Sequence, residues 1–396
     1  MTRSLHIIMF AAVAPLIGVS FAFADTAVLL DGQSVDAKIT AIADGSVRCG
    51  DQSIDLRQIR RLTFDAKADA APAAGRVYLA DGSVLIASNT RVGNQQCVID
   101  WAYGKGVGWS MDQVDAILPA APKVDAGGEA KLDPAFAEAL ANPHRVNDRL
   151  LVIADDRITA VDGALDELGD EQAVFVWQDQ PRKVSRAKLY GIVLARGEAP
   201  ADRAGWCLVH LADGSRLWGM TPTLDGNTLA LARGNQLLSF PARAVVRIDV
   251  RSDRLMFLSD LDPTAVADDA LFTFNGYQRD ASVLRRPITL GKNVYEKGLG
   301  THSPCRLTYA LDGRFDTFAA TIGVDDETYG RGDCIFKVAL DDKTIFEKRM
   351  RGSDPPHALR LPIAGAKTLT LIVEIGEDLD LSDHADWADA RLVREK

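Results

Sequence analysis

The amino-acid sequence predicts an all-β protein in which tandem small β-meander repeats precede a larger antiparallel β-sandwich. Three observations lead to this prediction: short strands of alternating apolar residues recur, Asp-Gly pairs separate many of them, and the strands become longer after residue 254. An Asp-Gly pair supplies the positive φ angles of a tight hairpin, so each pair indicates a strand, a turn and a second strand. With 396 residues the chain is long enough for two or three domains.

Four segments of similar pattern come first. Asp-Gly turns between apolar strands mark three of them, at residues 31–32, 81–82 and 213–214. A fainter copy begins at Leu151. Each copy closes on an apolar strand: Ile59–Leu62, Val114–Ile117, Leu189–Ile192 and Val245–Ile248. We predict two units in residues 25–119 and two in residues 146–253. One unit of about 40 residues can hardly bury a core alone, so the units are expected to be SH3-like or to pack in pairs.

Residues 120–145 are predicted to be a linker that contains one short helix. The stretch from Ala120 to Gly128 is rich in Ala, Pro and Gly, and Ala66–Gly75 is rich in Ala and Pro. Both compositions are typical of linkers. Asp133 is suited to cap the helix and Pro134 to occupy its first position. We expect this helix to be a strut between pairs of repeats.

The N-terminus has the layout of a secretory signal peptide. Arg3 precedes an apolar run, Leu5–Phe21, and the triplet Ala22-Phe23-Ala24 offers a cleavage site, so residues 1–24 are expected to be removed. An uncleaved membrane anchor is the alternative. No other apolar run is long enough to span a bilayer, so we predict a secreted, periplasmic or cell-envelope protein with no membrane span after cleavage.

Charge and cysteine content restrict the possible partners and chemistry. The formal net charge is −10, which repels phosphate backbones, so nucleic acid is not expected as a partner. The five cysteines are an odd number and are scattered, which does not fit a disulfide framework. Cys305 and Cys334 are the pair that could bridge neighbouring strands. No Cys-x-x-Cys or Cys/His pattern indicates zinc or redox chemistry.

Three sequence blocks in the last third carry a family resemblance. Tyr295–Ser303, Phe318–Glu327 and Asp383–Leu392 resemble, in order and spacing, the signature blocks of the NPCBM family of carbohydrate-binding modules. The resemblance implies that residues 254–396 form a galactose-binding-like jelly-roll β-sandwich. It also implies binding of a glycan or polysaccharide, with a galactose-like terminal sugar as the first candidate, and it does not imply an enzyme.

Sugar recognition requires an aromatic plane for the C–H face of a ring and planar polar groups for its hydroxyls. Trp387 is the candidate plane, because strand alternation puts it opposite the small residues that suit a core; a buried structural tryptophan is the alternative. The candidate polar groups lie in or beside the three blocks: His302, Glu327, Asp383, His384 and Asp386.

Loop carboxylates raise two further hypotheses. Calcium is common in the wider fold group that the resemblance implies, and hard oxygen ligands suit this ion. The candidate calcium ligands are Asp260, Asp262, Asp325 and Asp326. Paired carboxylates also serve glycoside hydrolysis, but adjacent residues point apart and cannot be assumed to flank one bond.

No nucleophile, zinc-protease or phosphate-loop motif is present in the sequence. We therefore predict a secreted, non-catalytic carbohydrate-binding protein, with the repeats as a spacer or as a docking region for an envelope protein. One alternative is a cell-envelope structural or assembly protein that uses the jelly roll for protein contacts. The other is a glycoside hydrolase with an unrecognised catalytic region.

Overall fold

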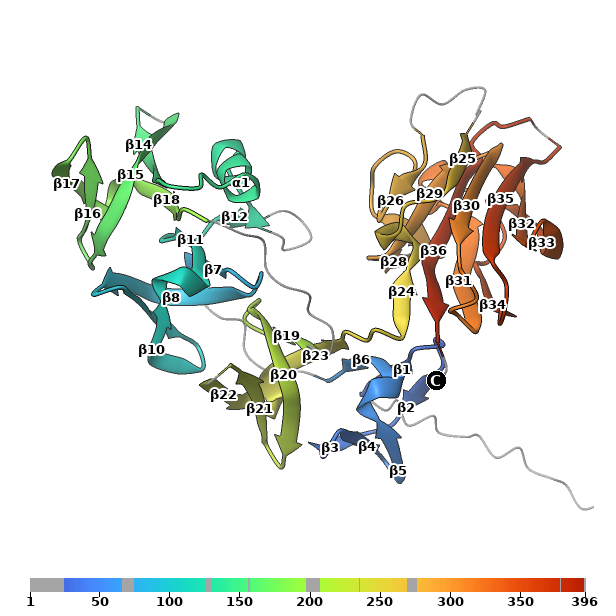
Figure 1. Cartoon of the computed structure of the whole chain (residues 1–396), viewed down its shortest axis with the longest axis horizontal. Helices are drawn as coiled ribbons and strands as arrows, with labels where there is room; N and C mark the ends of the chain where they lie inside the picture. Colours follow the sequence, from blue (N-terminus) through green and yellow to red (C-terminus); the bar gives the residue numbers. More distant parts are fainter. Residues whose placement is uncertain are drawn as a thin grey trace, which may run out of the picture.

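The computed structural model describes residues 25–65, 75–124, 130–155, 157–196, 207–234, 236–268, 276–377 and 379–394. Strands dominate these ranges, which confirms the predicted all-β fold class. Figure 1 shows two regions, one from the N-terminal strands in blue to olive and one from the C-terminal strands in yellow to red. The predicted signal peptide and residues 66–74 of the first predicted linker lie outside the described residues.

The strands before residue 251 form four units, each a meander whose last strand follows a short 3-10 turn. The first unit contains β1 (Thr26–Leu29), β2 (Ser34–Asp36), β3 (Ile39–Ala43), β4 (Ser46–Cys49), β5 (Gln52–Asp55) and β6 (Ile59–Thr63). The second contains β7 (Gly75–Leu79), β8 (Val84–Gly93), β9 (Gln96–Trp101), β10 (Gly104–Ser110) and β11 (Val114–Leu118). The third contains β14 (Asp148–Ala154), β15 (Arg157–Leu168), β16 (Gln172–Trp177), β17 (Gln180–Ser185) and β18 (Leu189–Val193). The fourth contains β19 (Cys207–Leu211), β20 (Arg216–Asp225), β21 (Thr228–Arg233), β22 (Gln236–Pro241) and β23 (Val245–Val250). The 3-10 turns are η1 (Leu56–Gln58), η2 (Met111–Gln113), η3 (Arg186–Lys188) and η4 (Ala242–Ala244).

The turn after the first strand is built in the same way in three units. Asp31, Asp81 and Asp213 each accept a hydrogen bond from the backbone N–H two residues further on, at 3.0, 2.9 and 2.8 Å. The intervening glycines have φ angles of 92°, 81° and 91°, which side-chain-bearing residues rarely adopt. Local chemistry therefore brings the second strand back against the first. The first strand of each unit also pairs with the last, which closes the meander on itself.

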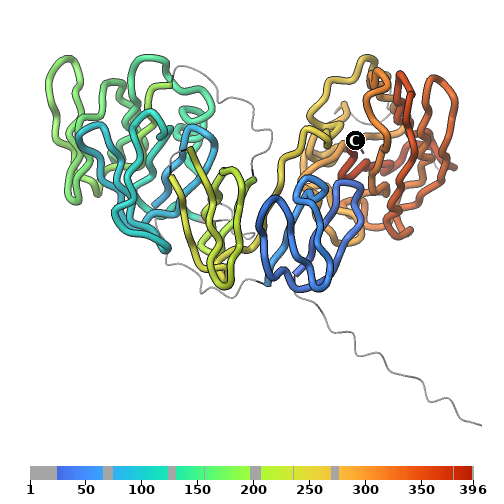
Figure 2. The backbone as a smooth tube through the Cα atoms, turned by 60° about the horizontal axis from the view of Figure 1, so that its bottom comes forward, coloured from blue at the N-terminus to red at the C-terminus, as the bar shows by residue number. Residues whose placement is uncertain are grey.

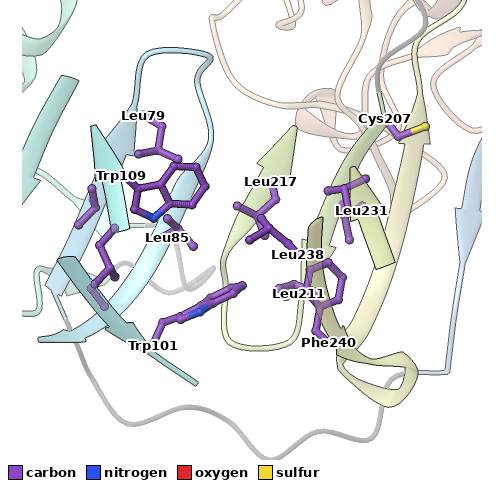
Figure 3. Close-up of a cluster of buried hydrophobic side chains, with 14 of the residues drawn as sticks. Leu79, Leu85, Trp101, Trp109, Cys207, Leu211, Leu217, Leu231, Leu238 and Phe240 are labelled. Carbon is purple, nitrogen blue, oxygen red and sulfur yellow. The ribbon is translucent and has the colours of Figure 1, made fainter. Parts of the chain in front are cut away.

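The units associate through their last strands. β6 pairs with β23, where Leu62 lies opposite Ile248, and β11 pairs with β18, where Ile117 lies opposite Ile192. The first unit is thus joined to the fourth, and the second to the third. One hydrophobic cluster contains buried residues of all four units. Figure 3 shows its side chains from the second and fourth units, where the rings of Trp101 and Phe240 are 6.4 Å apart.

Helix α1 (Pro134–Ala141) joins the second and third units. The Asp133 carboxylate accepts a hydrogen bond from the N–H of Ala135 at 2.9 Å, and the buried Phe136 packs between Tyr78 of β7 and Tyr190 of β18. A two-stranded ladder, β12 (Lys123–Val124) and β13 (Ala130–Lys131), precedes the helix. At eight residues α1 is too short to cross a bilayer, and the described part of the chain contains no helix that could do so.

The C-terminal region is a sandwich of two antiparallel sheets. The larger sheet contains β24 (Leu255–Phe257), β26 (Gln278–Arg279), β29 (Gly298–His302), β31 (Thr317–Val324), β34 (His357–Pro362) and β36 (His384–Val393). The smaller sheet contains β25 (Ala265–Asp268), β30 (Cys305–Ala310), β32 (Asp333–Leu340), β33 (Lys343–Arg351) and β35 (Thr368–Ile375). A hairpin, β27 (Ile288–Leu290) and β28 (Asn293–Tyr295), packs on Ala388 of the larger sheet. Two 3-10 turns, η5 (Leu258–Asp260) and η6 (Asp326–Thr328), lie in its connections.

The sandwich contacts the first and fourth units, as Figure 2 shows for the first. Arg391 of β36 is buried, and its Nε donates to the carbonyl oxygen of Leu30 at 3.0 Å. Asp389 forms an ion pair with Arg60 of β6. Glu296 bonds the guanidinium groups of Arg61 at 3.0 Å and of Arg247, in β23, at 2.9 Å. Polar and charged contacts therefore hold the two regions together.

All five cysteines are buried, and none of them forms a disulfide. Cys305 and Cys334 do not form a disulfide, because their strands, β30 and β32, lie on opposite sides of β35. Burial raises the pKa of Cys97 and of Cys207 to about 12, so these thiols stay protonated at neutral pH.

Candidate functional site

The candidate site lies at one end of the sandwich, where the last residue of β29 meets the first residue of β36 and the turn η6. His302 and His384 are paired across these strands, and their rings are 5.7 Å apart. The Nδ1 atom of His384 lies 2.9 Å from Oε1 of Glu327. Ser282 Oγ donates to the other Glu327 oxygen at 3.1 Å. The sequence blocks that carry the three candidate residues are therefore brought together in space.

The electrostatics of this cluster favour a neutral imidazole. Burial lowers the pKa of His384, and although the adjacent Glu327 carboxylate raises it, the net direction is downward. The His384 side chain is 18% exposed and that of Glu327 only 5%, so a ligand would meet the imidazole first. His302 is more deeply buried, and its Nδ1 lies 3.0 Å from the carbonyl oxygen of Ser303. A neutral imidazole has one nitrogen that donates and one that accepts, so the ring can form a hydrogen bond with a hydroxyl group while the carboxylate holds it in place.

Asp383 and Asp386 are both completely buried. The Asp383 carboxylate accepts hydrogen bonds from the hydroxyl of Ser303 and, at 2.7 Å, from the N–H of Asp333, and so ties the start of β36 to two neighbouring strands. Asp386 has no hydrogen-bond partner for either carboxyl oxygen among the described residues. Burial and the nearby Asp325 raise its pKa well above the usual range. Neither group is open to a ligand.

Trp387 lies in the core, so its predicted place on the outer face is wrong. It is 0% exposed, and its ring packs edge-on against Phe336 at 5.0 Å. The error has a local cause. Asp389 takes a left-handed φ of 55°, and the register of β36 against β31 shifts at this point. Because of this bulge, alternation does not continue along the strand. The side chains in the sandwich core are those of Ala385, Trp387, Ala390 and Leu392.

The four candidate calcium ligands do not gather at one point. The Asp260 carboxylate binds Lys297 at 2.6 Å and that of Asp262 binds Arg279 at 2.7 Å. The Asp325 and Asp326 carboxylates accept hydrogen bonds from backbone N–H groups of the β27–β28 hairpin and of η6. In the ranges that the structure describes, no group of three or more His, Cys, Asp or Glu side chains could hold a metal ion. The donors that calcium would need are already bonded to protein groups, so this set does not fit the ion.

An exposed aromatic side chain that is not among the predicted site residues lies beside the cluster. Tyr329 directly follows η6 and is 83% exposed, with a left-handed φ of 57°. Gly332 in the same loop touches the loop before β36, since a Cβ on it would lie 2.3 Å from the carbonyl oxygen of Ser382. Leu379 and Leu381 of that second loop are also exposed. The sequence signal for this exposed ring is that Tyr329 stands between an acidic turn and a glycine.

The sandwich and its polar loop-end cluster define the class of module. Residues 254–393 match the model of the "NPCBM/NEW2 domain" family. The C-terminal third is therefore an NPCBM domain, a type of carbohydrate-binding module, and the resemblance found in the sequence is confirmed.

Several known proteins are similar to parts of this chain. A Renibacterium salmoninarum protein named "Putative endo-alpha-N-acetylgalactosaminidase" is 31% identical over 108 residues, which cover 27% of this chain and 7% of that protein. A solved CBM51 module from a Clostridium perfringens GH95 protein, in complex with methyl-galactose, is 34% identical and covers 35% of this chain and 99% of that one, with a TM-score of 0.33. A CBM51-2 and INT domain structure from Clostridium perfringens ZmpB, in complex with GlcNAc, is 23% identical and covers 42% and 36%, also with a TM-score of 0.33. This chain thus spans a small part of the curated relative.

Proposed function

We propose that this protein is a secreted, non-catalytic carbohydrate-binding protein whose C-terminal sandwich binds a terminal sugar of the galactose type. The observation that carries the proposal is the pair formed by His384 and Glu327, 2.9 Å apart at the loop end of an NPCBM domain. The exposed ring of Tyr329, rather than Trp387, would stack on the C–H face of the sugar.

The choice of sugar is supported by the curated relative. Its printed name refers to α-linked N-acetylgalactosamine, and the 31% identity covers 108 residues. Galactose and N-acetylgalactosamine are therefore the first two ligands to test. A shallow site with few contacts is expected to bind with a dissociation constant of roughly micromolar to millimolar.

A non-catalytic role is supported by the burial of two acids beside the site. Asp325 and Asp386 are 2% and 0% exposed, so they cannot flank a glycosidic bond in solvent. For the four N-terminal units we propose tandem repeats that act as a spacer or as a docking region for an envelope partner. Their shared order of strands and turns supports the proposal of repeats.

The test is a calorimetric titration of the whole chain with galactose and with N-acetylgalactosamine. Tyr329→Ala should weaken binding by about 1 kcal/mol, the value of one aromatic contact. His384→Ala should weaken it by a similar amount, because one hydrogen bond to the sugar is lost. Trp177→Ala and His357→Ala are matched controls away from the site and should bind as the parent does. Absence of binding to any neutral sugar on a glycan array would refute the function, and full binding by both site variants would refute the location.

A further inference from the structure

A second site candidate lies where the first unit, the fourth unit and the sandwich meet. The cavity there has a volume of about 610 Å³. Its walls come from β6, β19, β20 and β23 on one side and from β24, β28 and the residues after β28 on the other. An adjoining hollow of about 300 Å³ shares Arg216, Arg247 and Glu296 with it. The volume of the larger cavity lies within the usual range of small-ligand pockets, about 300–1,000 Å³.

The walls of the two hollows carry more cations than acids, although the whole protein is acidic. The cations are Arg60, Arg61, Arg76, Arg216, Arg247, Arg251 and Lys297. The acids are Asp249, Asp260, Glu296 and Asp389. Since the chain has a formal net charge of −10, a local excess of positive charge at one junction is opposite to the general trend.

All four acids are neutralised by neighbouring cations. Asp389 pairs with Arg60, Asp260 with Lys297, and Glu296 with both Arg61 and Arg247. Asp249 pairs with the same two arginines and with His210. Although burial raises the pKa of Asp249, these bonds lower it to about 2, so the carboxylate stays ionised and fully engaged. The wall acids therefore do not cancel the remaining positive charge.

Two arginines of the larger cavity, Arg216 and Arg251, do not take part in these ion pairs. In the part of the chain that the structure describes, neither Arg216 nor Arg251 forms an ion pair, and both are exposed. The Arg251 guanidinium lies 5.6 Å from the centre of the Trp218 ring. Phe257 and Tyr295 add ring surface, and Ser252 adds a hydroxyl group. The cavity thus combines unpaired guanidinium groups with aromatic walls.

We infer that this junction is a second binding site, for an acidic saccharide whose carboxylate or sulfate group pairs with Arg216 and Arg251. The planar guanidinium group matches the geometry of both oxyanions, and aromatic rings suit the C–H faces of the sugar. A ligand here touches three parts of the chain at once. It therefore stabilises their arrangement, because it binds only the assembled form.

The experiment titrates the whole chain with a galacturonic acid trisaccharide, a sulfated galactose disaccharide, the neutral galactose disaccharide and inorganic sulfate. The two acidic saccharides should bind, more weakly as salt is added, and the trisaccharide should raise the melting temperature. Replacing both arginines, Arg216→Gln with Arg251→Gln, should weaken binding about 100-fold, which is roughly tenfold for each charged hydrogen bond. Arg182→Gln, an exposed arginine of β17, is the matched control and should change nothing.

Three outcomes would overturn the inference. They are no binding of either acidic saccharide, equal binding by the double variant and the parent, or sulfate alone binding as tightly as the saccharides. The His384→Ala variant separates this site from the proposed neutral-sugar site, since it should still bind the acidic ligands. A circular-dichroism melt of each variant verifies folding, which these exposed substitutions should preserve.

Discussion

The two regions of the molecule bury their cores in different ways. In the N-terminal region one cluster runs through all four small units, and the last strands of those units pair with each other. In the C-terminal region one sandwich encloses its own core around Trp387 and Phe336. A short repeat therefore gains stability from its neighbours, whereas a long domain gains it from within.

The largest expected effects come from one large-to-small change in each core. Trp387→Ala and Phe240→Ala should each cost about 3–5 kcal/mol, because both rings are almost fully buried. The first change should weaken the sandwich core and leave the core that the four units share intact. The second should destabilise all four units together, since Phe240 contacts Trp101 of another unit.

Hydrogen exchange, measured during denaturant unfolding, distinguishes loss of the sandwich alone from loss of all four units together. Trp177→Ala, at a ring that is 42% exposed, serves as the control. If Phe240→Ala released only the fourth unit and left the other three protected, the shared-core interpretation would have to be abandoned.

Removing the contact between the two regions should cause the next largest loss of stability. Arg391→Ala leaves the Leu30 carbonyl without its buried donor and removes one of the two arginine partners of Asp389, which should cost about 1–3 kcal/mol. The substitution should also let the sandwich and the units unfold at separate temperatures in calorimetry. Lys343→Ala, at an exposed position of β33, is the control. Joint melting of the two regions in the Arg391→Ala variant would show that this contact does not couple them.

A pH effect is expected from one buried acid of the sandwich. The raised pKa of Asp386 means that the folded state keeps its proton at pH values where the unfolded state has lost it. The stability that depends on this proton is complete at acid pH, below the unfolded pKa, and is lost as pH rises toward the folded pKa. Asp386→Asn should therefore gain roughly 1–3 kcal/mol relative to the parent at pH 7, and little at pH 3. Denaturation curves at both pH values measure it; an equal change at the two values would contradict the buried neutral acid.

The smallest effect concerns calcium. Because the four candidate carboxylates already bind lysine, arginine or backbone N–H groups, calcium or a chelator should shift the melting temperature of neither region. Thermal melts of the whole chain with millimolar calcium and with EDTA test this. A clear rise with calcium alone would restore a metal site.

Local features of this fold could be predicted from the sequence, and non-local ones could not. The Asp-Gly turns depend on two adjacent residues and their own N–H groups, so the pattern identified them. The bulge at Asp389 depends on a left-handed φ that no neighbouring residue signals, and it reversed the placement of Trp387. His302, His384 and Glu327 could be chosen as candidates because they lie in the three blocks that carry the family resemblance. The exposure of Tyr329 could not be predicted, because it depends on which loops cover the ring.

The pairing of the first unit with the fourth has a consequence for how the chain folds. Asp249 of β23 follows its partner Arg61 of β6 by 188 residues. During synthesis from the N-terminus, the open edge of β6 must wait until the fourth unit emerges. Such distant pairing slows folding, and an unpaired strand edge can recruit a wrong partner in the meantime. We expect the early chain to depend on chaperones until the fourth unit has formed and paired with the first.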